Sequence, residues 1–170
     1  RLKEPFPDQN NTNLCGPAAF FYCVLSSNNN VYKKIVKSLW ERGEVLHHRL
    51  TIKPNVHGAR TVSHYFNSRG DARISPVDWI TMGSLRDTAN TLTDYNRASG
   101  DGFVSDFING ITAFTMPDEV KNWLTAIGFS VPVYQSFMRQ KVPRSVDWLN
   151  QLRDLYNYPA SDHYYVLLTV

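Results

Sequence analysis

The residues best suited to chemistry are a cysteine near the start of the chain and a histidine near its end. Cys15 begins an apolar run in the segment Gln9-Asn10-Asn11-Thr12-Asn13-Leu14-Cys15-Gly16-Pro17-Ala18. A cysteine at a helix N-terminus lies beside unpaired backbone N–H groups and the positive end of the helix dipole, which favour the thiolate that attacks carbonyl groups. The sequence therefore predicts that Cys15 is a nucleophile, although a buried cysteine capping a core helix remains the plainer alternative.

Two other residues could complete such a site. Gln9 lies six positions before Cys15, on a loop that can fold back so that its amide donates a hydrogen bond to an oxyanion, with the N–H of Cys15 as second donor. His163 precedes an apolar run and could form an ion pair with the thiolate and then protonate the leaving group. The alternatives are a polar loop residue for Gln9, whose role its asparagine neighbours could take, and a core histidine for His163.

The pattern of these residues resembles that of the papain-like cysteine peptidases. In that superfamily a Gln-x5-Cys-Gly-x-Ala pattern opens the nucleophile helix, and the histidine begins an apolar strand; the matching residues are Gln9, Cys15, Gly16, Ala18 and His163. The chain resembles bacterial double-glycine-leader peptidases and effector toxins more closely than papain itself, and the segment 78–87 resembles one that recurs in bacterial secreted effectors. The likeness covers the beginning and the end of the chain.

One part of the family's pattern is missing. The Asp or Asn that orients the histidine normally follows the histidine strand, but none follows His163 in this sequence. The orienting group is therefore expected upstream, or beyond this segment, or the site works as a dyad. Asp78, Asp87 and Asn90 are candidates to orient His163 or to bind substrate, whereas acidic residues at a helix start or on its outer face are commonly solvated. Arg86 and Asp87 are equally consistent with a surface pair.

The resemblance implies a papain-like α+β fold, in which a helical half with the nucleophile helix packs against an antiparallel sheet half. It implies a cysteine-dependent hydrolase, a protease or amidase, that acts on a protein or peptide without a cofactor. It also implies a secreted protein or one delivered into a target cell, with an immunity protein or chaperone as partner. Deamidases, transglutaminases and acyltransferases begin with the same thiolate attack, and an inactive papain-like binding module is the remaining alternative.

Composition sets the wider limits. With 170 residues, the chain suits one domain, 1–170, which would bury roughly 70% of its unfolded surface and need no disulfide. The net charge of +3 is too small to demand nucleic acid or an anionic membrane as partner, and no apolar run approaches the ~20 residues of a membrane span. Because the sequence opens with Arg1, we expect a domain excised from a larger protein.

The second cysteine and the remaining histidines are expected to be structural or solvated. Cys15 and Cys23 on one helix would lie about 12 Å apart, too far for the roughly 7 Å limit of a disulfide, so Cys23 is expected to be buried and unpaired. His47, His48, His57 and His64 lie in polar surroundings. Since none has metal-ligand spacing to a cysteine, no zinc site is expected.

Apolar periodicity and capping residues predict the elements that must position these residues. The expected helices are Cys15–Leu25, Val31–Arg42 closed by Gly43, one from Ser75-Pro76 into the nineties, one from Thr115-Met116-Pro117 to Gly128, and one from Ser145 through Leu155. The expected strands are Leu50–Ile52, Phe129–Tyr134 and His163–Val170. Ser26–Asn30 is expected to be a break and Pro54–Ala72 an exposed, irregular connection, and all four tryptophans, Trp40, Trp79, Trp123 and Trp148, are expected to pack inside.

Overall fold

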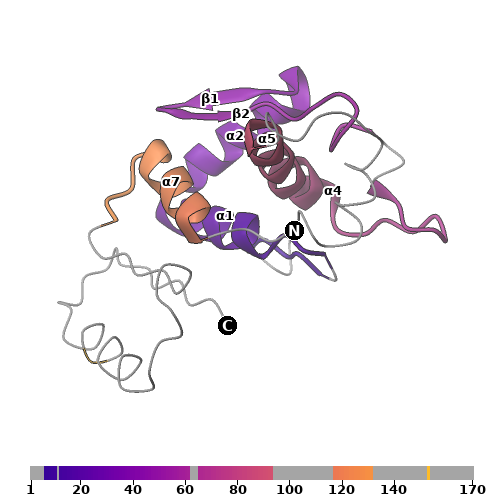
Figure 1. The fold of residues 1–170 in the computed structure, drawn as a ribbon, viewed down its shortest axis with the longest axis horizontal. Helices are drawn as coiled ribbons and strands as arrows, with labels where there is room; N and C mark the ends of the chain where they lie inside the picture. The colour runs from indigo at the N-terminus through magenta and orange to yellow at the C-terminus, as the bar shows by residue number, and fades with distance from the viewer. Residues whose placement is uncertain (1–5, 11, 62–64, 94–116, 132–152, 154–170) are drawn as a thin grey trace. The chain divides into compact units, whose positions relative to one another are not determined.

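The structure is a computed structural model that describes residues 6–10, 12–61, 65–93, 117–131 and 153 (Figure 1). The chain divides into two units, Arg1–Ser130 and Val131–Val170. All elements given below belong to the first unit. The expected helix from Ser145 (apart from Arg153), the strand His163–Val170 and Trp148 lie outside the described residues.

The first unit combines helices with one small sheet. Its elements are α1 (Cys15–Ser27), α2 (Asn29–Arg42), β1 (Val45–His47), β2 (Leu50–Ile52), α4 (Pro76–Asp78), the π-helix η1 (Trp79–Gly83), α5 (Ser84–Thr93) and α7 (Pro117–Ile127). The described part of this unit is therefore α+β, as expected, and the strands found in it form one antiparallel pair.

Capping residues set the ends of the first two helices. Asn28 is extended, and its side-chain oxygen accepts hydrogen bonds from the N–H groups of Asn30 and Val31 at 3.1 and 3.2 Å, so it ends α1 and caps α2. The break between the helices is this one residue, shorter than the predicted Ser26–Asn30. Gly43 ends α2 in the left-handed conformation, with φ 71°.

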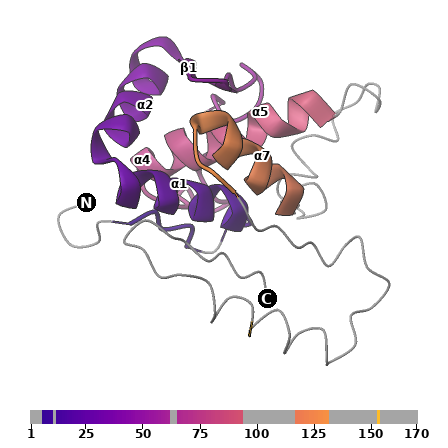
Figure 2. The same cartoon turned by 90° about the vertical axis from the view of Figure 1, so that its left-hand side faces the viewer.

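The core of the described region forms around α1, which packs against α2, α7 and η1. Figures 1 and 2 show α1 on one side of these helices and the β1–β2 pair on the opposite side. The fully buried side chains of α1 include Phe20 and Phe21, which make a perpendicular ring contact with centroids 4.9 Å apart. Phe20 also meets Trp123 of α7 edge to face, at 6.1 Å.

The prediction that the tryptophans pack inside is wrong for Trp40, on α2. Its side chain is 73% exposed, whereas Trp79 and Trp123 are buried as predicted. The buried residues of α2 are Tyr32, Ile35, Ser38 and Leu39. Each residue of a helix is turned by about 100° from the one before it. Trp40 is therefore about 100° from Leu39 and about 140–160° from Ile35 and Ser38, off the buried face.

The β1–β2 hairpin buries one face. Val45 pairs with Ile52 and His47 with Leu50, and Val45, Leu50 and Ile52 are buried. The turn is tied to α7, since the N–H of Arg49 donates to the carbonyl of Ala126 at 3.0 Å.

The run from Pro76 to Thr93 is the helix predicted from Ser75-Pro76, but it contains the unexpected π-helix η1. The Ser75 hydroxyl donates to the Asp78 carboxylate at 2.6 Å and accepts from the Asp78 N–H at 3.3 Å. Residues 81–90 are all buried. The predictions of solvated Asp78 and Asp87 and of an Arg86–Asp87 surface pair are therefore wrong.

Two further predictions need correction. Of the predicted strand Phe129–Tyr134, residues 132–134 lie outside the described residues, and Phe129–Val131 belong to no strand. The N–H of Phe129 turns back to the carbonyl of Leu124 at 2.9 Å, and Gly128, with φ 110°, closes α7. The connection Pro54–Ala72 is irregular, but Pro54 and Gly58 are buried in it, and Phe66 and Ala72 form an antiparallel bridge.

Candidate functional site

Cys15 is the first residue of α1 and is exposed. The preceding Leu14 is buried and supplies no side-chain cap, and the first hydrogen bond of the helix runs from the Ala18 N–H to the Leu14 carbonyl, at 2.8 Å. Among the residues that the structure describes, none accepts a hydrogen bond from the N–H of Cys15 or Gly16. Among these residues the first N–H groups of α1 thus have no acceptor, and an oxyanion at Cys15 could accept a hydrogen bond from the Cys15 N–H.

The second cysteine has the opposite environment. Cys23 lies two turns further along α1, is 1% exposed and is unpaired, as Cys15 is. Burial raises the pKa of the Cys23 thiol to about 11, so this side chain is a neutral thiol at neutral pH and out of reach of solvent. The predicted contrast between an exposed Cys15 and a buried, unpaired Cys23 is confirmed.

Gln9 lies in a tight turn just before α1. Its carbonyl accepts hydrogen bonds from the Thr12 N–H at 3.1 Å and from the Thr12 hydroxyl at 2.6 Å. The side chain of Gln9 is half-buried, and its Oε1 is buried without a hydrogen-bond partner among the described residues. Which amide atom is nitrogen and which is oxygen is set by hydrogen-bonding partners, so this amide can present a donor to a new partner.

Three of the five histidines lie among the described residues. His163 lies outside the described residues, as does His64. His48 and His57 are exposed as predicted, whereas His47 is half-buried, contrary to the prediction. Burial lowers the pKa of His47, and the nearby positive charges of His48 and Lys34 lower it further.

The carboxylate of Asp87 holds the segment that follows β2. Its Oδ2 accepts hydrogen bonds from the N–H groups of Asn55 and Ala59 at 2.8 and 2.9 Å. Asp78 is bonded to Ser75, at the start of its own helix. Both carboxylates and Asn90 are buried. The hydrogen bonds of Asp78 and Asp87 give these residues a structural role, which the sequence did not indicate.

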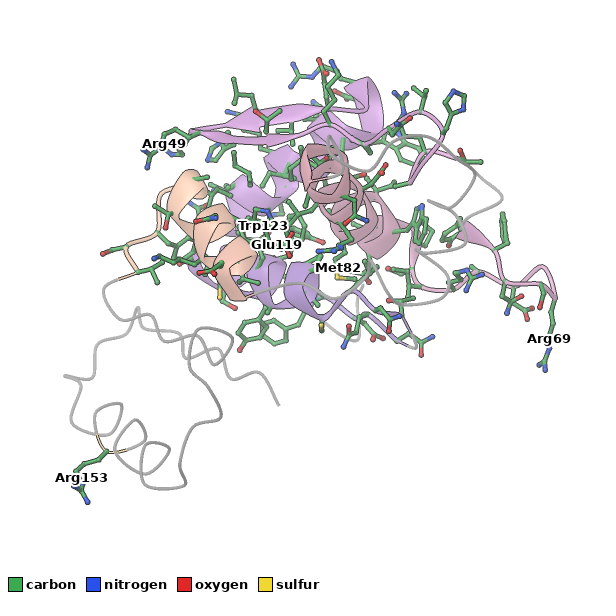
Figure 3. All side chains as sticks on the ribbon, viewed as in Figure 1. Arg49, Arg69, Met82, Glu119, Trp123 and Arg153 are labelled. Atoms are coloured by element: carbon green, nitrogen blue, oxygen red, sulfur yellow. The ribbon has the colours of Figure 1, made fainter. Side chains whose placement is uncertain are left out.

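An ion pair between two helices, with the Arg86 side chain buried and the Glu119 side chain half-buried, was also not predicted. The Arg86 guanidinium of α5 lies 3.2 Å from the Glu119 carboxylate of α7, and Figure 3 shows Glu119 and Trp123 on the same helix. Arg86 and Glu119 are 33 positions apart in the sequence, so no local sequence pattern indicates the pair.

Asn10 has a left-handed backbone, with φ 45°. A local sequence pattern does indicate this conformation, since Asp8-x-Asn10 is typical of Asx turns.

Within the described part of the chain, no group of three or more His, Cys, Asp or Glu side chains could hold a metal ion. None of the helices described here is long and apolar enough to cross a membrane. No family model, curated protein or solved structure matches the chain.

Proposed function

We propose that the chain is a cysteine-dependent hydrolase, a protease or amidase that acts on a protein or peptide. The observation that carries the proposal is the exposed Cys15 at the open N-terminus of α1, preceded by the turn that holds Gln9. In this proposal Cys15 is the nucleophile, Gln9 and the Cys15 N–H stabilise the oxyanion, and His163 is the acid and base.

The reaction proceeds through a thioester. The Cys15 thiolate attacks the substrate carbonyl carbon, a C–S bond forms, and the displaced electron pair becomes an oxyanion that accepts hydrogen bonds from the Gln9 amide and the Cys15 N–H. Collapse expels the amine, which takes a proton from the His163 imidazolium. Water, deprotonated by His163, then attacks the thioester carbonyl, the C–S bond breaks, and the acid is released as the Cys15 thiolate and the His163 imidazolium form again.

The same first step serves other enzymes. Deamidases, transglutaminases and acyltransferases differ from proteases in the leaving group or in the nucleophile that resolves the thioester. A papain-like fold, a bacterial effector or toxin role, delivery into a target cell and an immunity protein or chaperone as partner are further proposals, supported by the sequence resemblance. An inactive binding module with a papain-like fold is the second candidate.

Acylation by p-nitrophenyl acetate tests the proposal directly. The full chain should release nitrophenol and carry an acetyl group at Cys15 by mass spectrometry, and Cys15→Ala should do neither. His163→Ala should slow acylation by about 10²–10⁴-fold, the usual contribution of acid–base catalysis. Cys23→Ala and His57→Ala are the controls, since Cys23 is buried and His57 lies on an exposed loop.

The result also separates the alternatives. Acetylation that persists in Cys15→Ala, or that occurs at Cys23, would overturn the assignment of the nucleophile. A wild-type chain that is not acylated would favour the binding module. With peptide mixtures as substrates, mass spectrometry distinguishes shortened peptides, deamidated side chains and cross-linked products.

A further inference from the structure

The residue after Gln9 has an unusual backbone. Asn10 adopts a left-handed conformation, with φ 45°, which asparagine enters more readily than most side chains do. Its N–H donates to the Asp8 carboxylate at 2.8 Å, which closes an Asx turn around Gln9. The backbone direction of Gln9 is therefore set from its C-terminal side by Asn10.

The side chain of Asn10 reaches a distant segment. Its Nδ2 donates to the carbonyl of Arg73 at 3.2 Å, across 63 positions of sequence. Arg73 is itself held in the bridged turn of residues 65–73, because its N–H donates to the Tyr65 carbonyl at 3.1 Å and its Nε to the Phe66 carbonyl at 3.2 Å. This turn is an anchor outside the loop that carries Gln9.

These contacts have little to do with holding the whole fold. Asn10 is exposed, and hydrogen bonds that compete with water contribute little net stability. Their effect is local. The peptide unit that joins Gln9 to Asn10 is held at its carbonyl by Thr12 and at its N–H by Asp8. We propose that Asn10 is a positioning residue that acts through Gln9 to aim its amide at the oxyanion; this inference rests on the proposed function.

Aim matters because an oxyanion donor acts only within hydrogen-bond distance of the charge that develops. A displacement of about 1 Å can cost about 10²-fold in rate. Asn10→Ala removes both the side-chain bond to Arg73 and the preference for a left-handed backbone. We expect it to slow acylation of Cys15 by p-nitrophenyl acetate at least about tenfold.

A second reagent separates aim from general damage. Iodoacetamide alkylates the thiolate by displacement at carbon and forms no oxyanion, so its rate at Cys15 reports exposure and thiolate content alone. Asn10→Ala should leave this rate unchanged. Asn10→Gly keeps the left-handed backbone and loses only the bond to Arg73, so its acylation rate should lie between those of the wild type and Asn10→Ala. Asn29→Ala is the matched control, because Asn29 is exposed at the start of α2 and its side chain makes no hydrogen bond among the described residues.

The pair of variants tests whether Asn10 acts through Gln9. Gln9→Ala should lower the acylation rate by about 10²-fold, and Gln9→Ala with Asn10→Ala should be no slower than Gln9→Ala alone. An additive double variant, an Asn10→Ala chain acylated at the wild-type rate, or equal losses in acylation and alkylation would each overturn the inference and leave the proposed function standing. A wild-type chain that is not acylated would overturn the proposed function instead.

Discussion

At the scale of single residues, Gly58 allows the segment after β2 to pack closely against Asp87. Asp87 is fully buried, and a buried carboxylate needs hydrogen-bond donors to offset its lost hydration. The backbone of residues 55–59 supplies them. It can come this close because residue 58 is a glycine, since a Cβ at this position would collide with the Asp87 Oδ2.

We therefore expect Gly58→Ala to lower the free energy of unfolding by about 1–3 kcal/mol, the usual range for overpacking. The N–H groups of Asn55 and Ala59 should also exchange faster with solvent, because the loop must lift from Asp87. Urea denaturation and hydrogen exchange measure the two effects.

Gly70→Ala is the matched control for Gly58→Ala. Its φ is 84° and nothing lies within 4 Å of its Cβ position, so it should show only a backbone penalty, roughly 1–2 kcal/mol, with no change in exchange at Asn55. Unchanged exchange at Asn55 and Ala59 in Gly58→Ala would show that the loop is not seated on Asp87.

These residues also show what the sequence could reveal about the candidate site. The contrast between Cys15 and Cys23 follows from helical spacing and the apolar pattern of one segment, so it was predictable. The burial of Asp87 was not, because its partners are backbone N–H groups 28 and 32 positions away. The role of His163 stays a prediction, since it lies outside the described residues.

At the scale of elements, α5 and α7 are joined by the Arg86–Glu119 pair, in which the Arg86 side chain is 6% exposed and the Glu119 side chain 21% exposed. Neutralising Glu119 removes the charge-assisted bonds of its carboxylate from a guanidinium that stays buried, and this costs more than the intact pair contributes. The link therefore matters for how α7 is held against the helix that precedes it.

Glu119→Gln should lower the free energy of unfolding by about 1–3 kcal/mol, because the Arg86 guanidinium then loses its charge-assisted bonds. Glu41→Gln breaks an exposed pair with Lys37, 3.8 Å long, and should change stability by at most about 1 kcal/mol. Urea denaturation of both variants compares them. Equal losses in the two would mean that the Arg86–Glu119 pair behaves as a surface pair.

Element boundaries were predictable where a local signal sets them. Ser75, Gly43 and Gly128 act at helix ends through their own backbone or side-chain geometry, and each ends or begins a helix as expected. The predictions failed where packing between distant segments decides. Trp40 lies off the buried face of α2, and the π-helix η1 forms inside a sequence with ordinary helical periodicity.

At the scale of the molecule, the chain divides after Ser130, and the buried hydrophobic residues of the described region run from Leu14 to Ile127. The described core therefore belongs to the first unit, together with Cys15 and Gln9. The proposed chemistry also needs His163, which belongs to the second unit. The acid–base step and the nucleophile can thus be separated by truncation.

A chain of residues 1–130 should keep its core and alkylate Cys15 faster than Cys23, because α1 packs against α2, α7 and η1 of the same unit, with Cys15 exposed and Cys23 buried. Its acylation by p-nitrophenyl acetate should fall about 10²–10⁴-fold, to the rate of full-length His163→Ala, because both lack the same imidazole. Circular dichroism provides the check that the fragment is folded. If the folded fragment is acylated as fast as the full chain, the base must lie in the first unit, and His57 and His64 become the histidines to replace.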